Sequence, residues 1–282
     1  MRIVFLFFAL YFFTINTNAN DDVLVVTEVM PPFQIVNAED GQLEGLGVNI
    51  VEYMLKEANI DGFRCDVADN VPTEFWEYAV PKLEEQKPLF MLMESKKPYL
   101  FKGIFDMGYG WDLHQIMNDV AKGEKTVADI DAYMVKKDTM YDAADIMMNF
   151  TSNHDENAWN GSAIERLGDS AETFAALTYM VPGMPLIYSG QEYDIDRRLK
   201  FFEKDSIPTE KKKMYAVYEK LGKLKNDDLA LNGGKKPAAY NRIKTSDDTN
   251  ILAFEREKDC EKASYIANLS NSPKTFTLPV AG

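Results

Sequence analysis

The sequence predicts an α/β protein with a largely parallel sheet, followed by a small antiparallel β region near the C-terminal end. Two observations support this prediction. From residue 23 to about residue 225, apolar or β-branched runs alternate with segments of helical periodicity, which is typical of βα repeats with right-handed crossovers. Beyond residue 226 the chain changes to short alternating segments between polar turns, which is typical of antiparallel strands.

The expected elements follow one another in a regular order. Strands are predicted at residues 23–29, 63–67, 89–93, 105–108, 147–152 and 185–190. Helices are predicted at residues 48–59, 73–85, from 112 onward, 163–181 and 210–225. Antiparallel strands are predicted in the segments AAYNRIK, NILAFERE, ASYIANLS and TFTLPV, after a boundary at residues 231–235. Functional side chains of such a fold are expected where the parallel strands end.

The N-terminus has the pattern of a signal peptide. Arg2 is followed by the apolar run at residues 3–13 and then by the small residue Ala19, as a charged region, a short apolar region and a cleavage site would be. A membrane anchor is the alternative, but this run is shorter than the roughly 20 apolar residues that span a bilayer. We therefore expect a secreted or periplasmic protein that begins near Asn20 and has no stable membrane insertion.

Charge and cysteine content exclude several classes of function. The chain of 282 residues has 31 Lys and Arg against 45 Asp and Glu, a formal net charge of -14. This surplus repels phosphate backbones, and no basic cluster alternates with aromatic residues, so no nucleic-acid partner is expected. Cys65 and Cys260 have no metal-binding spacing. Cys65 is expected to be a buried strand residue, and a bridge to Cys260 is the less favoured alternative.

The predicted strand at residues 63–67 carries two charged residues. Arg64 and Asp66 are two positions apart, so both side chains point to the same face of the strand. A neighbouring cation keeps a carboxylate ionised, as a nucleophile requires. A surface salt bridge is the common arrangement for such a pair, but here it lies in an apolar strand, where charges are costly. Asp66 is therefore a candidate nucleophile.

Glu94 ends the next predicted strand, in the run LFMLMES. After so many apolar residues its carboxyl group is expected in a partly desolvated position, and desolvation raises the pKa of an acid. A raised pKa suits a group that protonates a leaving oxygen near neutral pH. A glutamate at the start of a helix is the alternative interpretation.

A polar cluster follows the strand predicted at residues 147–152. Asn153, His154, Asp155, Glu156 and Asn157 stand in one run, which makes a binding or catalytic site the favoured interpretation of His154 over a structural histidine. The second histidine, in YGWDLHQ, stands near the start of a predicted helix and is expected to be structural.

Two aromatic residues near the strand ends, Trp159 and Tyr193, either stack on a sugar or pack against the protein. The residues alone leave both alternatives open.

The three acidic segments resemble glycoside hydrolase family 13, the α-amylase family. DGFRCDVA, MLMES and SNHDE are similar in order to its second, third and fourth conserved regions, and FDMGYGWDLHQIMN and GMPLIYSGQE resemble α-amylases of the Bacteroidetes type. The likeness covers roughly residues 52–282. It implies a (β/α)8 TIM barrel of which about five or six βα units are present, followed by a small antiparallel β domain.

The resemblance also implies roles for individual residues. Asp66 is the nucleophile, Glu94 the acid/base and Asp155 the third carboxylate, while Arg64 and His154 support the bound sugar. The implied reaction is retaining hydrolysis of α-1,4-glucans such as starch or maltooligosaccharides, with Asp66 and Glu94 about 5 to 5.5 Å apart. No cofactor is expected, because the inserted domain that helps to bind calcium in the family is not evident, and no residue is assigned to a metal.

The sequence departs from the family at its N-terminal side. The first three barrel units and a DxxxNH region are missing, so the chain is expected to be truncated or hybrid, with impaired activity. Residues 23–57 instead resemble the start of a family 3 extracellular solute-binding protein, so a non-catalytic binding fusion is the alternative function. The expected divisions are a signal peptide at 1–19, this segment at 20–57, a partial barrel at 58–230 and a β domain at 231–282.

The replacement segment leads to a structural hypothesis. The strand at residues 23–29 is expected to pair in parallel with the strand at residues 63–67, as the crossover rule for βα units requires. The sheet would then have six strands and remain open. Because open edges present unpaired backbone groups, self-association is expected.

Overall fold

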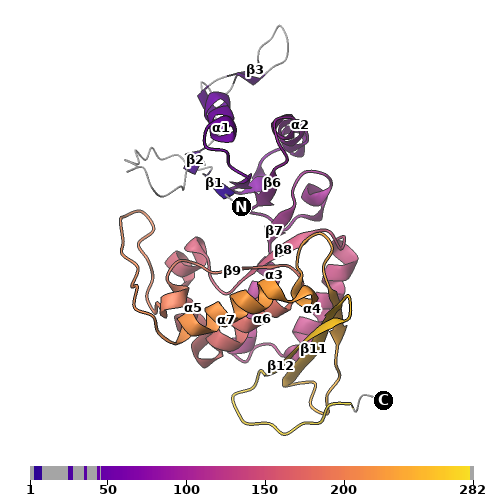
Figure 1. The fold of residues 1–282 in the computed structure, drawn as a ribbon. Helices are drawn as coiled ribbons and strands as arrows, with labels where there is room; N and C mark the ends of the chain where they lie inside the picture. The colour runs from indigo at the N-terminus through magenta and orange to yellow at the C-terminus, as the bar shows by residue number, and fades with distance from the viewer. Residues whose placement is uncertain (1–2, 8–24, 28–34, 37–42, 45, 280–282) are drawn as a thin grey trace. The chain divides into compact units, whose positions relative to one another are not determined.

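The computed structural model describes residues 3–7, 25–27, 35–36, 43–44 and 46–279. The chain divides into two compact units, unit 1 at Met1–Tyr109 and unit 2 at Gly110–Gly282 (Figure 1). The expected divisions at residues 57 and 230 stay predictions.

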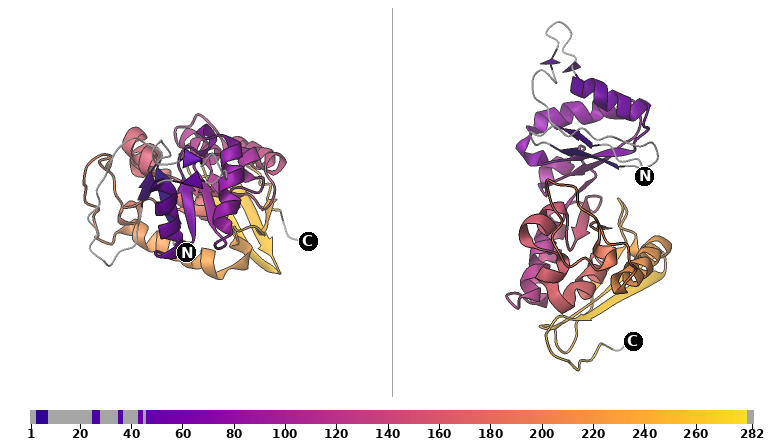
Figure 2. Two further views of the ribbon diagram at one scale, coloured as in Figure 1. Left: turned by 90° about the horizontal axis from the view of Figure 1, so that it is seen from above. Right: turned by 90° about the vertical axis from the view of Figure 1, so that its left-hand side faces the viewer.

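Unit 1 contains a parallel sheet. Its strands lie in the order β2, β1, β5, β6, β7, with bounds Val25–Thr27, Ile3–Phe7, Gly62–Cys65, Phe90–Met93 and Met107–Tyr109. All four strand pairs are parallel. The helices α1 (Leu46–Lys56) and α2 (Thr73–Glu84) lie on one side of these strands (Figures 1 and 2). The short pair β3 (Ile35–Val36) and β4 (Leu43–Glu44) is antiparallel.

The expected pairing of residues 23–29 with residues 63–67 is wrong. β1 lies between them, pairing with β5 on one side and with β2 on the other. The physical reason is the composition of β1, whose sequence IVFLF has the β-branched and aromatic residues that strands favour. Residues 3–7 of the apolar run that suggested a signal peptide therefore form a strand. This strand takes the place beside β5 that was expected for residues 23–29.

A glycine fixes the close approach of β5 to β6. A Cβ atom on Gly62 would lie 1.9 Å from the carbonyl oxygen of Phe90, so only glycine allows this spacing. Next to these strands, the Trp76 indole on α2 donates to the Ala68 carbonyl at 2.9 Å and packs edge-on against Phe105. These contacts hold α2 against the segment that follows β5.

Unit 2 combines a parallel strand pair, a layer of helices and an antiparallel sheet. The pair is β8 (Ile146–Phe150) with β9 (Met184–Leu186). The helices are α3 (Trp111–Ala121), α4 (Val127–Met140), α5 (Ala163–Leu167), α6 (Ala171–Met180), α7 (Lys213–Asp227) and the π-helical turn η3 (Glu156–Asn160). The antiparallel sheet has the order β10 (Ala239–Arg242), β11 (Ile251–Lys258), β12 (Glu261–Asn268).

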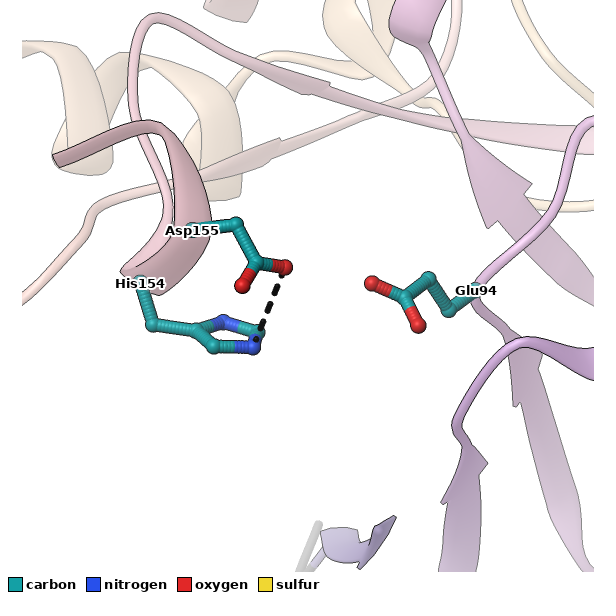
Figure 3. A group of neighbouring side chains, drawn as sticks. All are labelled: Glu94, His154 and Asp155. Atoms are coloured by element: carbon teal, nitrogen blue, oxygen red, sulfur yellow. Dashed lines mark ion pairs between the residues drawn. The ribbon is translucent and has the colours of Figure 1, made fainter. Parts of the chain in front are cut away.

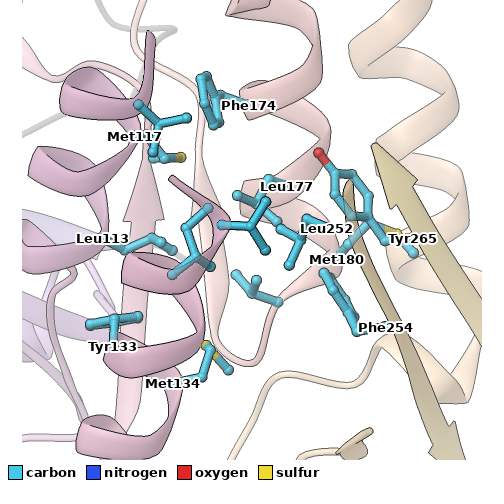
Figure 4. Packing of buried hydrophobic residues seen from close by; sticks show 14 of the residues in the cluster. Leu113, Met117, Tyr133, Met134, Phe174, Leu177, Met180, Leu252, Phe254 and Tyr265 are labelled. Atoms are coloured by element: carbon cyan, nitrogen blue, oxygen red, sulfur yellow. The ribbon is translucent and has the colours of Figure 1, made fainter. Parts of the chain in front are cut away.

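The core of unit 2 joins its helices to the antiparallel sheet. Leu113 and Met117 of α3, Leu177 of α6, and Leu252 and Phe254 of β11 are among its fully buried members (Figure 4). Burial of such side chains is the main stabilising contribution in a domain of this size. The prediction of an antiparallel C-terminal region is thus confirmed for three segments. The described part of TFTLPV, residues 275–279, forms no strand, although the Ser246 amide donates to the Thr277 carbonyl at 3.2 Å.

Two helices differ from the prediction. The helix expected at residues 163–181 is interrupted at Gly168, whose φ is 53°, so α5 and α6 are separate. The bounds of α4 were not predicted from the sequence, although Thr126 and Asp129 form a capping box at its start. The remaining short helices are η1 (Ala68–Asn70), η2 (Pro98–Phe101), η4 (Gly168–Ser170), η5 (Gln191–Tyr193) and η6 (Leu229–Leu231). Among the described residues, no helix is long and apolar enough to cross a membrane.

Candidate active site

Asp66 and Glu94 lie side by side in unit 1. The residues before them, Cys65 and Met93, are partners in the parallel register of β5 and β6, and the Glu94 amide donates to the Cys65 carbonyl at 2.8 Å. Both acids therefore leave the sheet at the same edge. This is the position at which parallel α/β folds place catalytic groups.

Arg64 joins the two carboxylates. Its side chain is completely buried, forms an ion pair with Asp66, and places Nη2 2.9 Å from Glu94 Oε1. Its Nε donates to the Tyr109 hydroxyl at 3.2 Å. Burial would lower the pKa of Arg64, but Tyr109, Glu94 and Asp66 outweigh it and raise that pKa. Tyr109 is a member of the site that the sequence analysis missed, although it stands in the quoted segment FDMGYGWDLHQIMN at the end of β7.

Glu94 has the properties expected of an acid catalyst. Burial raises the pKa of Glu94 to about 7, against the opposing charge of Arg64 and a hydrogen bond from the Val67 amide. That amide lies 2.8 Å from Glu94 Oε2. The charge of Asp66 raises the pKa further. A contact with the Asp66 side chain adds the smallest contribution to the raised pKa of Glu94. The predicted effect of desolvation on this group is therefore found in the structure.

His154 and Asp155 lie in unit 2, directly after β8. His154 Nε2 is 3.4 Å from Asp155 Oδ2, and the two side chains are 24% and 32% exposed (Figure 3). The preceding Asn153 is buried and shapes this turn, because its side chain accepts from the Glu156 amide at 2.8 Å and its carbonyl accepts from the Asn157 amide at 2.9 Å. The two partly exposed groups are thus carried by a firmly bonded turn.

A buried polar network supports the same turn. His114 Nε2 lies 3.0 Å from Glu156 Oε2, and its Nδ1 lies 3.2 Å from the Phe150 carbonyl. Arg166 donates to Asn118 Oδ1 and to the Thr151 carbonyl, both at 2.6 Å. Burial raises the pKa of Glu156, but the His114 hydrogen bond and charge outweigh it and leave it lowered. The burial of His114 agrees with the structural role expected of it.

Glu156 and Arg166 were not identified from the sequence as members of the site. For Glu156 the sequence offered one signal, its position directly after Asp155 in the run SNHDENAW.

Neither cysteine is in a disulfide, and Cys65 is buried as expected while Cys260 is exposed. Within each unit taken by itself, the described residues bring no three His, Cys, Asp or Glu ligand atoms together in a metal-sized cluster. The expectation that the protein needs no cofactor stays a prediction.

Comparison with known sequences identifies related enzymes. No family model matches the chain. It is 24% identical to the α-amylase MalA of Haloarcula japonica over 224 residues, 78% of this chain and 33% of that one. It is 26% identical to a cyclomaltodextrinase of Thermoanaerobacter pseudethanolicus, covering 80% of this chain and 40% of that one. An intracellular maltogenic amylase of Bacillus subtilis is 25% identical over 93% of the chain. These relatives are enzymes of the α-amylase family.

The solved structures agree with this finding. The maltogenic α-amylase AmyB of Thermotoga neapolitana matches with a TM-score of 0.70 and 25% identity, over 79% of this chain and 52% of that one. A cyclomaltodextrinase structure at 20% identity has a TM-score of 0.66 and shows the likeness of fold. The structural neighbours are TIM-barrel amylases, and together with the relatives they support a glycoside hydrolase.

The chain spans about a third to two fifths of the length of the first two relatives. The resemblance to solute-binding proteins and the alternative function based on it find no support in these comparisons.

Proposed function

We propose that the chain is a glycoside hydrolase that cleaves α-1,4-glucans, such as starch or maltooligosaccharides, by a retaining mechanism. The observation that carries the proposal is the pair Asp66 and Glu94, joined by the buried Arg64 at the ends of neighbouring strands. Two carboxyl groups of different proton affinity are the requirement for this reaction. Arg64 places a positive charge beside both of them.

The proposed reaction has two displacements. In the first, the Asp66 carboxylate attacks the anomeric carbon, the glycosidic carbon–oxygen bond breaks, and Glu94 gives its proton to the leaving oxygen. In the second, Glu94 takes a proton from water, the water oxygen attacks the anomeric carbon, and the bond to Asp66 breaks. With a pKa of about 7, Glu94 serves as an acid and then as a base at neutral pH.

Asp155 and His154 complete the proposal. Asp155 is assigned as the third carboxylate, which stabilises positive charge on the sugar ring in the transition state, and His154 as a donor to a sugar hydroxyl. Opposite charge placed where charge develops is a large contribution to catalysis.

Two further expectations are proposed with this function. The chain is exported, and it associates with itself through open sheet edges. Pairing of β1 with β5 and removal of residues 1–19 exclude each other in one molecule. Mass spectrometry of the exported protein decides between them, because a mature chain that begins near Asn20 cannot contain β1.

The function is tested by assaying soluble starch and p-nitrophenyl maltoside with the chain and with Asp66→Asn. Loss of the nucleophile is expected to lower turnover roughly 10³-fold or more. Asp69→Asn is the control, because Asp69 is an exposed acid three positions further along in η1. Proton NMR of the first product should show the α-anomer. Equal turnover in the two variants, or a β-anomer, would contradict the proposal.

A further inference from the structure

We propose that three exposed aromatic side chains of unit 2, Trp159, Phe201 and Phe202, form a stacking surface for an α-glucan chain. We call these three residues the aromatic platform. The proposal rests on the proposed function, because it takes the glucan as ligand. It adds a second place of contact for that ligand, next to His154.

The rings of the platform form one continuous group. Phe201 lies 5.2 Å from Trp159 and 4.8 Å from Phe202, measured between ring centroids, and Trp159 lies 6.2 Å from Phe202. Phe201 also stacks on His154, with centroids 6.0 Å apart and planes at 23°. The platform is therefore continuous with the His154–Asp155 pair.

These side chains are unusually open for aromatic residues. Trp159 is 56% exposed, Phe202 61% and Phe201 41%. Exposed apolar groups are costly, and a contiguous patch rimmed by polar residues marks an interaction site more often than scattered single residues do. Trp76, by contrast, is buried and bonded through its indole nitrogen.

The loop that carries Phe201 and Phe202 is held in place at its ends. Arg197 forms two hydrogen bonds with Asp205, at 2.8 and 3.1 Å, and a third with the Ser206 carbonyl. Asp205 also accepts from the amides of Lys200 and Ser206. The Arg197 hydrogen bond, followed by those amides, lowers the pKa of Asp205. The loop thus stays closed by an ionised carboxylate at neutral pH.

A second set of contacts ties the loop to the turn after Asp155. The buried Asn157 accepts from the Leu199 amide at 2.7 Å and donates to the Arg197 carbonyl at 3.3 Å. Arg198 pairs with Glu165 at 2.9 Å and donates to the Trp159 carbonyl at 3.2 Å. Rings held in place in this way lose little conformational entropy when a ligand binds.

The charges around the platform indicate an uncharged ligand. Arg197, Arg198 and Lys200 are each paired with an acid, Asp205, Glu165 and Glu203 respectively. Positive and negative charges around the rings therefore balance. Neither an anionic surface nor a charged peptide is favoured as the ligand of the platform. A glucan is neutral, with C–H groups on the ring faces and hydroxyls at the rim. It matches aromatic faces bordered by paired polar groups.

The test measures binding of maltoheptaose by intrinsic fluorescence and by calorimetry, in the chain carrying Glu94→Gln so that turnover does not interfere. Trp159 is the most exposed of the three tryptophans, so maltoheptaose should change its emission. Trp159→Ala and Phe202→Ala should each weaken calorimetric binding about 10-fold, in line with the loss of one stacking contact. Tyr99→Ala is the matched control, because Tyr99 is 48% exposed and lies outside the platform, and should bind unchanged.

Circular dichroism and melting temperature establish that each variant is folded, and Trp159→Phe should recover most of the affinity. Equal affinity in all variants, or no binding of maltoheptaose at all, would overturn the proposal. A change in sedimentation coefficient without a change in glucan affinity would assign the platform to self-association instead, and would also overturn it. Platform-dependent binding in a chain that hydrolyses nothing would contradict the proposed function but not this inference.

Discussion

Each unit of the molecule contains a completely buried arginine, and the two are bound in opposite ways. Arg64 in unit 1 faces Asp66, Glu94 and the Tyr109 hydroxyl. Arg256 in unit 2 donates to the backbone carbonyls of Met180, Ala238 and Ala239, at 2.9 to 3.0 Å. Burial lowers the pKa of Arg256 to about 10, whereas the acidic partners of Arg64 raise its pKa despite burial.

This comparison shows how a buried charge can be assigned a role from its partners. Carbonyl groups satisfy the hydrogen bonds of a guanidinium without responding to pH, so Arg256 links α6 to the antiparallel sheet as a structural element. Carboxylates couple the guanidinium to proton binding, so Arg64 affects the chemistry of its neighbours. Burial alone does not distinguish the two arginines, because both side chains are completely buried.

The largest expected effect is that of replacing each arginine by methionine. Arg64→Met leaves two facing carboxylates without a cation and should lower the free energy of unfolding at pH 7 by about 3 to 5 kcal/mol. Arg256→Met leaves carbonyl groups without donors and should cost about 1 to 3 kcal/mol. Urea unfolding measures both. The cost of Arg64→Met should shrink at pH 4.5, where Glu94 is protonated, and that of Arg256→Met should not. The same pH dependence in both variants would show that Arg64 is no more coupled to proton binding than Arg256.

The second largest expected effect concerns the contribution of Glu94 protonation to stability. Its pKa in the folded chain is about 7, above the ordinary value of 4.5, so the folded state binds more protons between these values. Its contribution to stability is therefore present below pH 4.5 and is lost as the pH rises through 7, by roughly 3 kcal/mol in all. Glu94→Gln should remove this loss, which the difference between the two unfolding curves from pH 4.5 to 7.5 shows. A constant difference across that range would mean that Glu94 has an ordinary proton affinity.

The third prediction concerns Glu156 of unit 2 and its contact with His114. Glu156 Oε2 lies 3.0 Å from His114 Nε2, which belongs to α3, while Glu156 itself belongs to the turn after β8. Glu156→Gln keeps a neutral hydrogen bond to His114 and should cost about 1 to 2 kcal/mol at pH 7. Because the folded pKa of Glu156 is lowered, its contribution is present above the ordinary value and is lost as the pH falls.

The matched control for that variant is Glu210→Gln, because Glu210 is 79% exposed on its side chain and 3.8 Å from Lys212. Thermal unfolding at pH 7 should show no effect of this control. An equal effect of the two variants would show that the buried pair adds nothing to the stability of the turn.

Much of the fold was predictable from local patterns. The strands that lead to Asp66 and Glu94 were found because buried parallel strands have continuous apolar runs, and the antiparallel region was found from its alternation. The order of strands in unit 1 was not predictable. Several apolar segments compete for one edge of β5, and the sequence does not state which of them pairs there. The role of β1 as a strand is the clearest example.

The site was predictable in its acids but not in its supporting groups. Asp66 and Glu94 end apolar strands, which is a local signal. Tyr109 and Asn157 act through contacts with residues 45 and 42 positions away, and no local pattern reports such contacts. The same limit applies to Arg166, whose partner Asn118 is 48 positions away. Long-range polar partners of this kind become visible only when the chain is folded.

The smallest expected effect concerns Val67, which directly follows Asp66 and contacts Glu94 through its amide. Val67 follows Asp66 with φ 36° and ψ 46°, in the left-handed region, where a β-branched side chain is strained. Its amide donates to Glu94 Oε2, so this strain accompanies a contact that lowers the pKa of Glu94. Glycine adopts the same conformation without a Cβ clash but loses more entropy on folding. Val67→Gly should therefore raise stability by about 1 kcal/mol or less.

The control is Val135→Gly on the exposed side of α4, where no left-handed angle is relieved and glycine should lower stability. Thermal unfolding compares the two variants. If both are destabilised equally, the backbone of Val67 is not strained, and the hydrogen bond to Glu94 is made at no conformational cost. If Val67→Gly is the more stable variant while turnover is unchanged, the strain is separable from the chemistry. A fall in turnover together with the gain in stability would instead show that the left-handed valine holds Glu94 in its working position, as Arg64 does from the other side.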